Sequence, residues 1–238
     1  MTDQKDTSSD SYCHQTADGR TLRGVVFDMD GLMFNSETIY DMVGDTLLQR
    51  RGYRFSKELK DAMMGLPPEK TFGVMIDWHK LDDDWKSLSV ESNEVFLTLI
   101  DDHLEMMPGL AELLDALEAA GIPKAIGTSS SIQLAHPCLN KYSLIERFTA
   151  ILTCESITRG KPNPEIYEKA AAKLGLSSRE VLIFEDSHYG CRAAHAAGAL
   201  TVAVPGEHSM DHDFSMADFV ANSLADPRIY ETLGISQG

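Results

Sequence analysis

The sequence predicts an α/β fold, in which a Rossmann-like parallel sheet core carries an inserted α-helical cap domain. From Arg23 onward, short apolar runs alternate with segments of helical spacing, which is typical of a parallel sheet covered by helices. Between the first apolar run and Pro108 lies a long stretch with helical patterns and no convincing strand. A helical insertion behind the first strand accounts for both observations.

Five apolar runs have the length and composition of buried strands. They cover residues 24–27, 123–127, 181–184, 200–204 and, as a short final strand, 219–220. Helices are expected over residues 110–117, 163–174 and 193–197. A glycine follows each of these helical segments within a few residues, and glycine is the residue preferred just after a helix C-terminus.

The inserted stretch, residues 37–103, is expected to be the helical cap. Its apolar stripes begin at Ile39, Leu59 and Trp85, and Gly52 and the turn at 65–68 separate them. The remaining α/β core then comprises residues 23–36 and 104–238. Residues 1–22 are polar and are expected to form a flexible N-terminal tail.

The composition restricts the partners of the protein. The formal net charge is -16, so the overall field repels nucleic acid and anionic membrane surfaces. No stretch approaches the about 20 apolar residues of a spanning helix, and the polar N-terminus has no apolar core of a secretory signal. We expect a cytoplasmic monomer that binds neither nucleic acid nor membranes. Any phosphate site in so acidic a chain needs local positive charge.

Polar side chains follow three of the expected strands at the point where each strand ends. The segments are Asp28-Met29-Asp30-Gly31, Thr128-Ser129-Ser130 and Glu185-Asp186-Ser187. The carboxyl ends of parallel strands meet at one edge of a sheet, where open α/β folds bind ligands. Four carboxylates gathered there repel one another unless a cation neutralises them. Ligands that are all oxygens favour a hard cation, and Mg²⁺ is the expected ion if the site handles phosphate.

These residues resemble the motifs of the haloacid dehalogenase-like superfamily, in its phosphatase branch with a helical cap. The matching segments are Asp28-Met29-Asp30-Gly31-Leu32, Thr128-Ser129-Ser130, Lys161-Pro162-Asn163-Pro164 and Phe184-Glu185-Asp186-Ser187. Each is weak alone, but all four occur in order, each at an expected strand end or turn. The resemblance covers residues 23–224. It is nearest to the β-phosphoglucomutase-like proteins and to phosphatases of the kind that act on pseudouridine 5′-phosphate.

The resemblance implies a role for each catalytic residue. Asp28 is the expected nucleophile, which forms an aspartyl-phosphate. Asp30 is the expected general acid and base. Thr128 is expected to donate a hydrogen bond to a phosphoryl oxygen, and Lys161 to supply fixed positive charge. The chain then resembles a phosphatase of small phosphorylated metabolites, such as sugar, nucleoside or polyol phosphates.

The resemblance also implies a set of metal ligands. Mg²⁺ is expected to be held by Asp28, by the backbone carbonyl of Asp30 and by Asp186. Glu185 is expected either to reach the ion through water or to orient Lys161.

Substrate contacts and one departure from the family pattern complete the expected site. Ser129 is expected to share phosphate binding with its neighbours. Met64 and Gly65, beside the cap turn, are the cap residues expected to touch substrate. Family members commonly have an acidic residue where this chain has Asn35. An amide holds neither a proton nor a metal in the same way, so we expect a supporting or cap-hinge role to change before the chemistry does.

Other functions fit less well. Dehalogenases and phosphonate hydrolases of this superfamily lack the second aspartate that is present here as Asp30. A phosphosugar mutase of the β-phosphoglucomutase type is the main alternative, since it uses the same four motifs. Such mutases place an arginine shortly after the cap-loop glycine, and this chain has only Lys70 there. A non-enzymatic alternative is a catalytically silent binding module, because a fold alone does not guarantee activity.

Overall fold

The computed structural model describes residues 12–63 and 66–237. Its centre is a six-stranded parallel sheet in the order β5-β4-β3-β6-β7-β8. The strands are β3 (Gly24–Phe27), β4 (Lys124–Gly127), β5 (Ala150–Leu152), β6 (Val181–Glu185), β7 (Leu200–Ala203) and β8 (Phe219–Val220). Strand β3, which comes first in the chain among these six, therefore lies between β4 and β6. The carboxyl ends of β3, β4 and β6 meet at one edge of the sheet.

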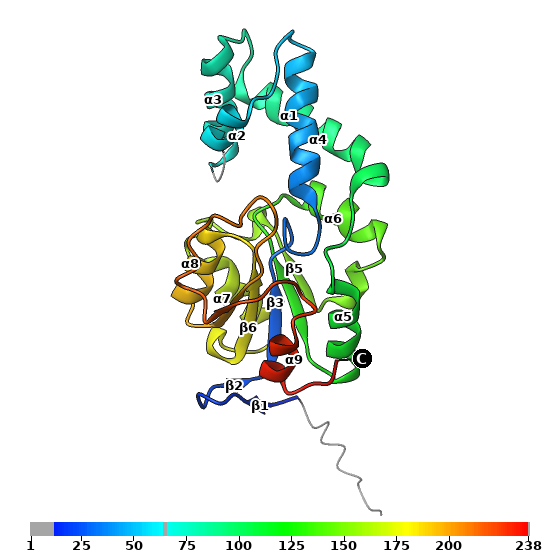
Figure 1. The fold of residues 1–238 in the computed structure, drawn as a ribbon, viewed down its shortest axis with the longest axis vertical. Helices are drawn as coiled ribbons and strands as arrows, with labels where there is room; N and C mark the ends of the chain where they lie inside the picture. The colour runs from blue at the N-terminus through cyan, green and yellow to red at the C-terminus, as the bar shows by residue number, and fades with distance from the viewer. Residues whose placement is uncertain (1–11, 64–65, 238) are drawn as a thin grey trace, which may run out of the picture.

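Helices cover both faces of this sheet (Figure 1). The helices of residues 110–237 are α5 (Leu110–Ala119), α6 (Ile132–Lys141), α7 (Glu165–Lys173), α8 (His188–Ala196) and α9 (Pro227–Leu233). Three 3-10 turns, η1 (Ile145–Arg147), η2 (Cys154–Ser156) and η3 (Ser178–Glu180), lie in the connections. Because side chains alternate along a strand, Val26 packs in the cluster that includes residues of α7 and α8. Its neighbours Val25 and Phe27 pack in the cluster that includes residues of α5, α6 and α9.

The four helices between β3 and α5 form a helical layer. They are α1 (Ser36–Gln49), α2 (Lys57–Met63), α3 (Pro68–His79) and α4 (Trp85–His103). Helix α4 packs on α1 and on α3 and also on α6, and Figure 1 shows α1 to α3 above the end of the sheet from which α1 leaves β3. None of the described helices has both the length and the apolar character required of a membrane span.

The expected α/β architecture is confirmed, and the differences lie in short or irregular elements. Strand β5 was missed because it has three residues, of which only Leu152 is buried. Helix α6 was missed because Pro137 lies inside it, and an internal proline usually argues against a helix. Helices α3 and α9 were not identified either.

The expected flexible tail is wrong for the part of it that the structure describes. Residues 14–22 contain two short antiparallel strands, β1 (His14–Gln15) and β2 (Thr21–Leu22). Leu22 is fully buried, and the Tyr12 hydroxyl donates a hydrogen bond to the carbonyl of Leu233 at the end of α9. The residue that Tyr12 contacts lies 221 positions later in the chain, so the polar sequence of the N-terminal segment does not indicate that this segment packs on α9.

Candidate active site

Asp28 and Lys161 meet at the carboxyl end of the central strand. The N–H of Asp28 donates to the carbonyl of Phe184 at 3.0 Å, which extends the β3–β6 ladder by one residue and holds the carboxylate at the sheet edge. Lys161, in the turn before α7, donates from Nζ to Oδ1 of Asp28. Both side chains are buried. Burial alone would lower the pKa of Lys161, but Asp28 and Glu185 together raise it, so the ammonium stays charged.

Glu185 is held by hydrogen bonds to both of its carboxylate oxygens. Oε1 accepts from Lys161 Nζ at 2.7 Å and from the Tyr167 hydroxyl. Oε2 accepts from the backbone N–H groups of Asp186 and Ser187, each at 3.1 Å, and from the Ser187 hydroxyl at 2.9 Å. The side chain is fully buried. A carboxylate so fully hydrogen-bonded is suited to orienting Lys161.

Asp30 contacts the end of the neighbouring strand β4. Its Oδ2 accepts from the hydroxyls of Thr128 at 3.0 Å and Ser130 at 2.7 Å. Its other oxygen, Oδ1, is buried and has no hydrogen-bond partner among the described residues. An unpaired buried carboxylate oxygen is costly, so Oδ1 is available to a ligand.

Gly31 allows the chain to turn beside Asp186. Its φ is +77°, in the left-handed region that glycine occupies without strain. A Cβ at this position would overlap the Asp186 carboxylate. The sequence motif therefore needs glycine here both for its conformation and for its close approach to the third acidic residue.

The acidic residues could hold a divalent cation. Asp28, Glu185 and Asp186 each place a carboxylate oxygen within 4.8 Å of the other two. Together with Asp30, these residues bring four carboxylates to the site, and Lys161 supplies one ammonium. The Asp186 carboxylate accepts no hydrogen bond from the described residues and forms no ion pair with them. Oxygen-only donors and an excess of negative charge fit Mg²⁺. Since Glu185 is already saturated, Asp28 and Asp186 are the better-suited side-chain ligands.

The ionisation of these groups reflects their crowding. Burial raises the pKa of Asp28, and the charges of Glu185 and Asp30 add to this while Lys161 opposes it. Burial also raises the pKa of Asp186 well above its usual range, and Glu185 and Asp28 raise it further. A bound cation favours the ionised carboxylates, so metal binding is expected to release protons.

The helical layer contributes charged residues that sequence analysis did not assign. Glu37, in the first turn of α1, has its pKa raised to about 7, first by burial and then by the charge of Asp30. Lys60 on α2 donates to Asp41 at 2.5 Å and lies 3.1 Å from Nδ1 of His208, in the loop after β7. The Lys60–His208 contact joins the helical layer to the core. Of these residues, only Glu37 had a signal in the sequence that could have placed it near the site, because it follows the first motif closely.

Of the three residues expected to bind substrate, the structure describes only Ser129. Ser129 is exposed at the end of β4, whereas its neighbour Ser130 contacts Asp30. Ser129 therefore stays a prediction. Met64 and Gly65 lie outside the described residues.

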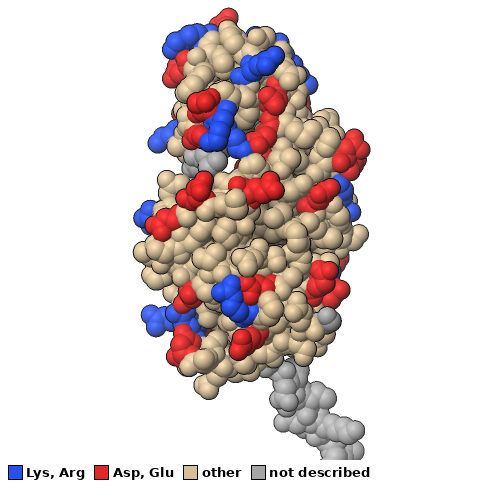
Figure 2. Space-filling view, in the orientation of Figure 1, with Lys and Arg blue, Asp and Glu red and all other residues tan. Residues whose placement is uncertain are grey.

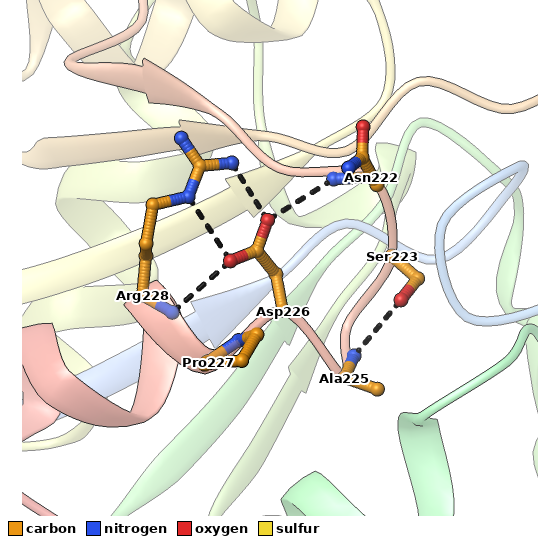
Figure 3. A pocket seen from close by; sticks show the side chains of 6 residues that line it. All are labelled: Asn222, Ser223, Ala225, Asp226, Pro227 and Arg228. Carbon is orange, nitrogen blue, oxygen red and sulfur yellow. Dashed lines mark hydrogen bonds and ion pairs between the residues drawn. The ribbon is translucent and has the colours of Figure 1, made fainter.

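A surface hollow elsewhere on the molecule has no part in this site. It has a volume of about 470 Å³ and is lined by Asn222, Ser223 and residues 225–228, around the start of α9. Figure 3 shows that its charged groups bond to one another, with Asp226 accepting from Arg228. None of its lining residues belongs to the catalytic group, and its polar contacts serve to begin α9.

The charged side chains on one face of the molecule are mixed in sign. On the face drawn in Figure 2, and leaving aside the grey residues, Lys and Arg are interspersed with Asp and Glu.

Comparison with known proteins identifies the family. Residues 25–204 match the family model described as haloacid dehalogenase-like hydrolase. A relative in Arabidopsis thaliana, (DL)-glycerol-3-phosphatase 2, is 30% identical over 223 residues, which cover 89% of this chain and 91% of the relative. Hexitol phosphatase B of Escherichia coli K12 is 26% identical over 223 residues, covering 90% and 98%.

Solved structures share the fold. The crystal structure of CbbY from Rhodobacter sphaeroides in complex with phosphate superposes with a TM-score of 0.77, covering 86% of this chain and 95% of that one, at 23% sequence identity. The sequence motifs, the arrangement of the strands and the family match agree. The chain belongs to the haloacid dehalogenase-like hydrolases.

Proposed function

We propose that the protein is a Mg²⁺-dependent phosphatase that hydrolyses a small phosphomonoester through an aspartyl-phosphate on Asp28. The observation that carries the proposal is the buried group in which Lys161 lies between Asp28 and Glu185 while Asp186 has no cationic partner among the described residues. A nucleophile, a fixed ammonium and a cation site in one place match the requirements of phosphoryl transfer.

In the first step an Oδ atom of Asp28 attacks phosphorus. The new Asp28 O–P bond forms as the bond from phosphorus to the ester oxygen breaks, and Asp30 donates a proton to the departing alcohol. Thr128 and Ser130, which bond to Oδ2 of Asp30, are suited to hold this carboxyl in place. The unpaired Oδ1 of Asp30 is the atom available for proton transfer.

In the second step water releases the phosphate. Asp30 takes a proton from the water, whose oxygen bonds to phosphorus while the Asp28 O–P bond breaks. The products are inorganic phosphate and regenerated Asp28, so the enzyme ends as it began. Lys161 balances the negative charge of the transferring group throughout.

Asp28 and Asp186, with the carbonyl of Asp30, would hold Mg²⁺. The ion supplies positive charge that neutralises the phosphoryl oxygens in a chain of net charge -16. The chain's own contribution is to keep these oxygens close together and buried.

The substrate is proposed to be a sugar, nucleoside or polyol phosphate. Two relatives are named for hexitol and glycerol 3-phosphate hydrolysis, which supports this class. We also propose that residues 37–103 act as a cap over the site. Within this segment, Glu37 lies near Asp30, and Lys60 contacts His208 in the loop after β7. Polar and charged groups there suit a hydroxylated leaving alcohol.

The test is phosphate release from a panel of sugar, nucleoside and glycerol monophosphates, with Mg²⁺ and with excess chelator. We expect release that requires Mg²⁺ and needs no bisphosphate activator. Release unaffected by the chelator would overturn the metal dependence. Isomerised sugar phosphate without net phosphate release would indicate a mutase, and no turnover of any ester would indicate a binding module.

A further inference from the structure

Tyr167 lies behind the catalytic group and contacts two of its members. It projects from α7 and is fully buried. Its hydroxyl donates to Oε1 of Glu185 at 2.5 Å, and the same oxygen accepts from Lys161 at 2.7 Å. The Lys161 ammonium also lies 4.9 Å from the centre of the Tyr167 ring, which is within the range of a cation–π contact.

The hydroxyl completes the set of donors around a buried carboxylate. The other oxygen of Glu185 is held by two backbone N–H groups and the Ser187 hydroxyl. On the Oε1 side only Lys161 and Tyr167 donate among the described residues. Without the tyrosine hydroxyl, Lys161 would be the only donor that fixes this side. Charge-assisted hydrogen bonds of this kind are the strong ones in proteins.

We propose that Tyr167 is a positioning residue for Lys161, acting through Glu185 and through the face of its ring. The inference rests on the proposed phosphatase function, because the ammonium matters where phosphoryl charge develops. Burial, followed by the charge of Glu185, raises the pKa of the Tyr167 hydroxyl well above its usual range, so it acts as a donor and takes no part in proton transfer. Its effect is on geometry.

Tyr167→Phe is the direct test, because it keeps the ring and removes only the hydroxyl. Losing one hydrogen bond to a charged group should lower kcat by about tenfold. KM should stay within about twofold, since Lys161 is proposed to act on charge that develops in the transition state. The matched control is Tyr12→Phe, which removes a hydroxyl bonded to the carbonyl of Leu233. That control should leave both kinetic constants unchanged.

A double-mutant cycle with Glu185→Gln separates positioning from packing. The two N–H groups and the hydroxyl that now donate to Oε2 would hold the oxygen of the introduced amide on their side. The NH₂ of that amide would then face Tyr167, and the donation from the tyrosine hydroxyl would be lost already. Tyr167→Phe should therefore cost less than about twofold in kcat in the Glu185→Gln background.

The outcomes of these experiments are distinct. Unchanged kcat in Tyr167→Phe, or an equal tenfold loss in both backgrounds, would overturn the positioning role while the phosphatase function stands. A wild-type protein that hydrolyses no ester of the panel would overturn the proposed function and the role of Tyr167 with it.

Discussion

Asn35 and Glu105 join the two chain segments that connect the helices α1 to α4 with the sheet. The N–H of Asn35 donates to the carbonyl of Glu105 at 3.1 Å, and the N–H of Glu105 donates to Oδ1 of Asn35 at 2.8 Å. Nδ2 of Asn35 donates to the carbonyl of His103 at 3.2 Å. An amide is needed for this arrangement, because a carboxylate has no hydrogen to donate to His103.

Asn35→Asp should weaken this connection. The substitution replaces a donor with a second acceptor that faces the carbonyl of His103, so we expect a loss of about 1 kcal/mol in the free energy of unfolding. Urea denaturation at pH 7 measures it. Asn93→Asp on α4 is the control, because its side chain bonds to no described residue and the charge change is the same. Equal stability of Asn35→Asp and wild type would show that the hydrogen bond from Asn35 to the carbonyl of His103 does not stabilise the fold.

Asp28→Asn should abolish turnover and leave the fold intact. The amide keeps the shape of the side chain but is no nucleophile, so we expect kcat to fall by at least about a thousandfold. Stability should change little, since burial already disfavours the ionised form of Asp28 and Lys161 keeps Glu185 as a partner. Phosphate release and circular dichroism measure the two effects. Hydrolysis at the wild-type rate would remove Asp28 from the mechanism.

The central strands and the catalytic motifs could be predicted because their signals are local. An apolar run such as 181–184, followed directly by Glu185 and Asp186, contains both the strand and the polar strand end. The parallel arrangement then brings the strand ends together without further information. This is why residues as distant as Asp28, Thr128 and Asp186 could be assigned to one site, whereas Lys161, which follows no strand, was placed there only by the family resemblance.

The residues that were missed depend on contacts between distant segments. Tyr167 lies within the expected helix 163–174, but its hydroxyl contact with Glu185 is a tertiary feature that the helical pattern does not indicate. Lys60 and His208 lie 148 residues apart, and neither belongs to a motif. Their contact depends on how the helical layer sits on the core, which periodicity does not determine.

Gly190→Ala should damage the site through Glu185. Gly190 is on α8, and a Cβ there would overlap the Glu185 carboxylate, so the carboxylate would have to move away from Lys161. We expect kcat to fall by more than about tenfold. Steady-state phosphate release measures this loss.

Gly73→Ala provides the matched control for that variant. Gly73 is also helical, in α3, and a Cβ there meets nothing within 4 Å. It should raise the free energy of unfolding by about 0.5 to 1 kcal/mol through helix propensity and leave kcat unchanged. If Gly190→Ala also retained wild-type kcat, the close packing of α8 against Glu185 would have no catalytic importance.

Asp226→Asn should lose stability in a pH-dependent way. Hydrogen bonds from Arg228 lower the pKa of Asp226 to about 2, whereas an unfolded chain has about 3.9. A carboxyl with a depressed folded pKa stabilises the fold above its unfolded pKa, and the contribution is lost as the pH falls from about 4 towards about 2.

The amide keeps an oxygen that can accept from the N–H of Arg228 at the start of α9, so the difference from wild type reports mainly the ion pair. Urea denaturation should show wild type more stable than Asp226→Asn at pH 7, with a smaller gap at pH 3, and a gap that stays constant between these pH values would contradict the depressed pKa.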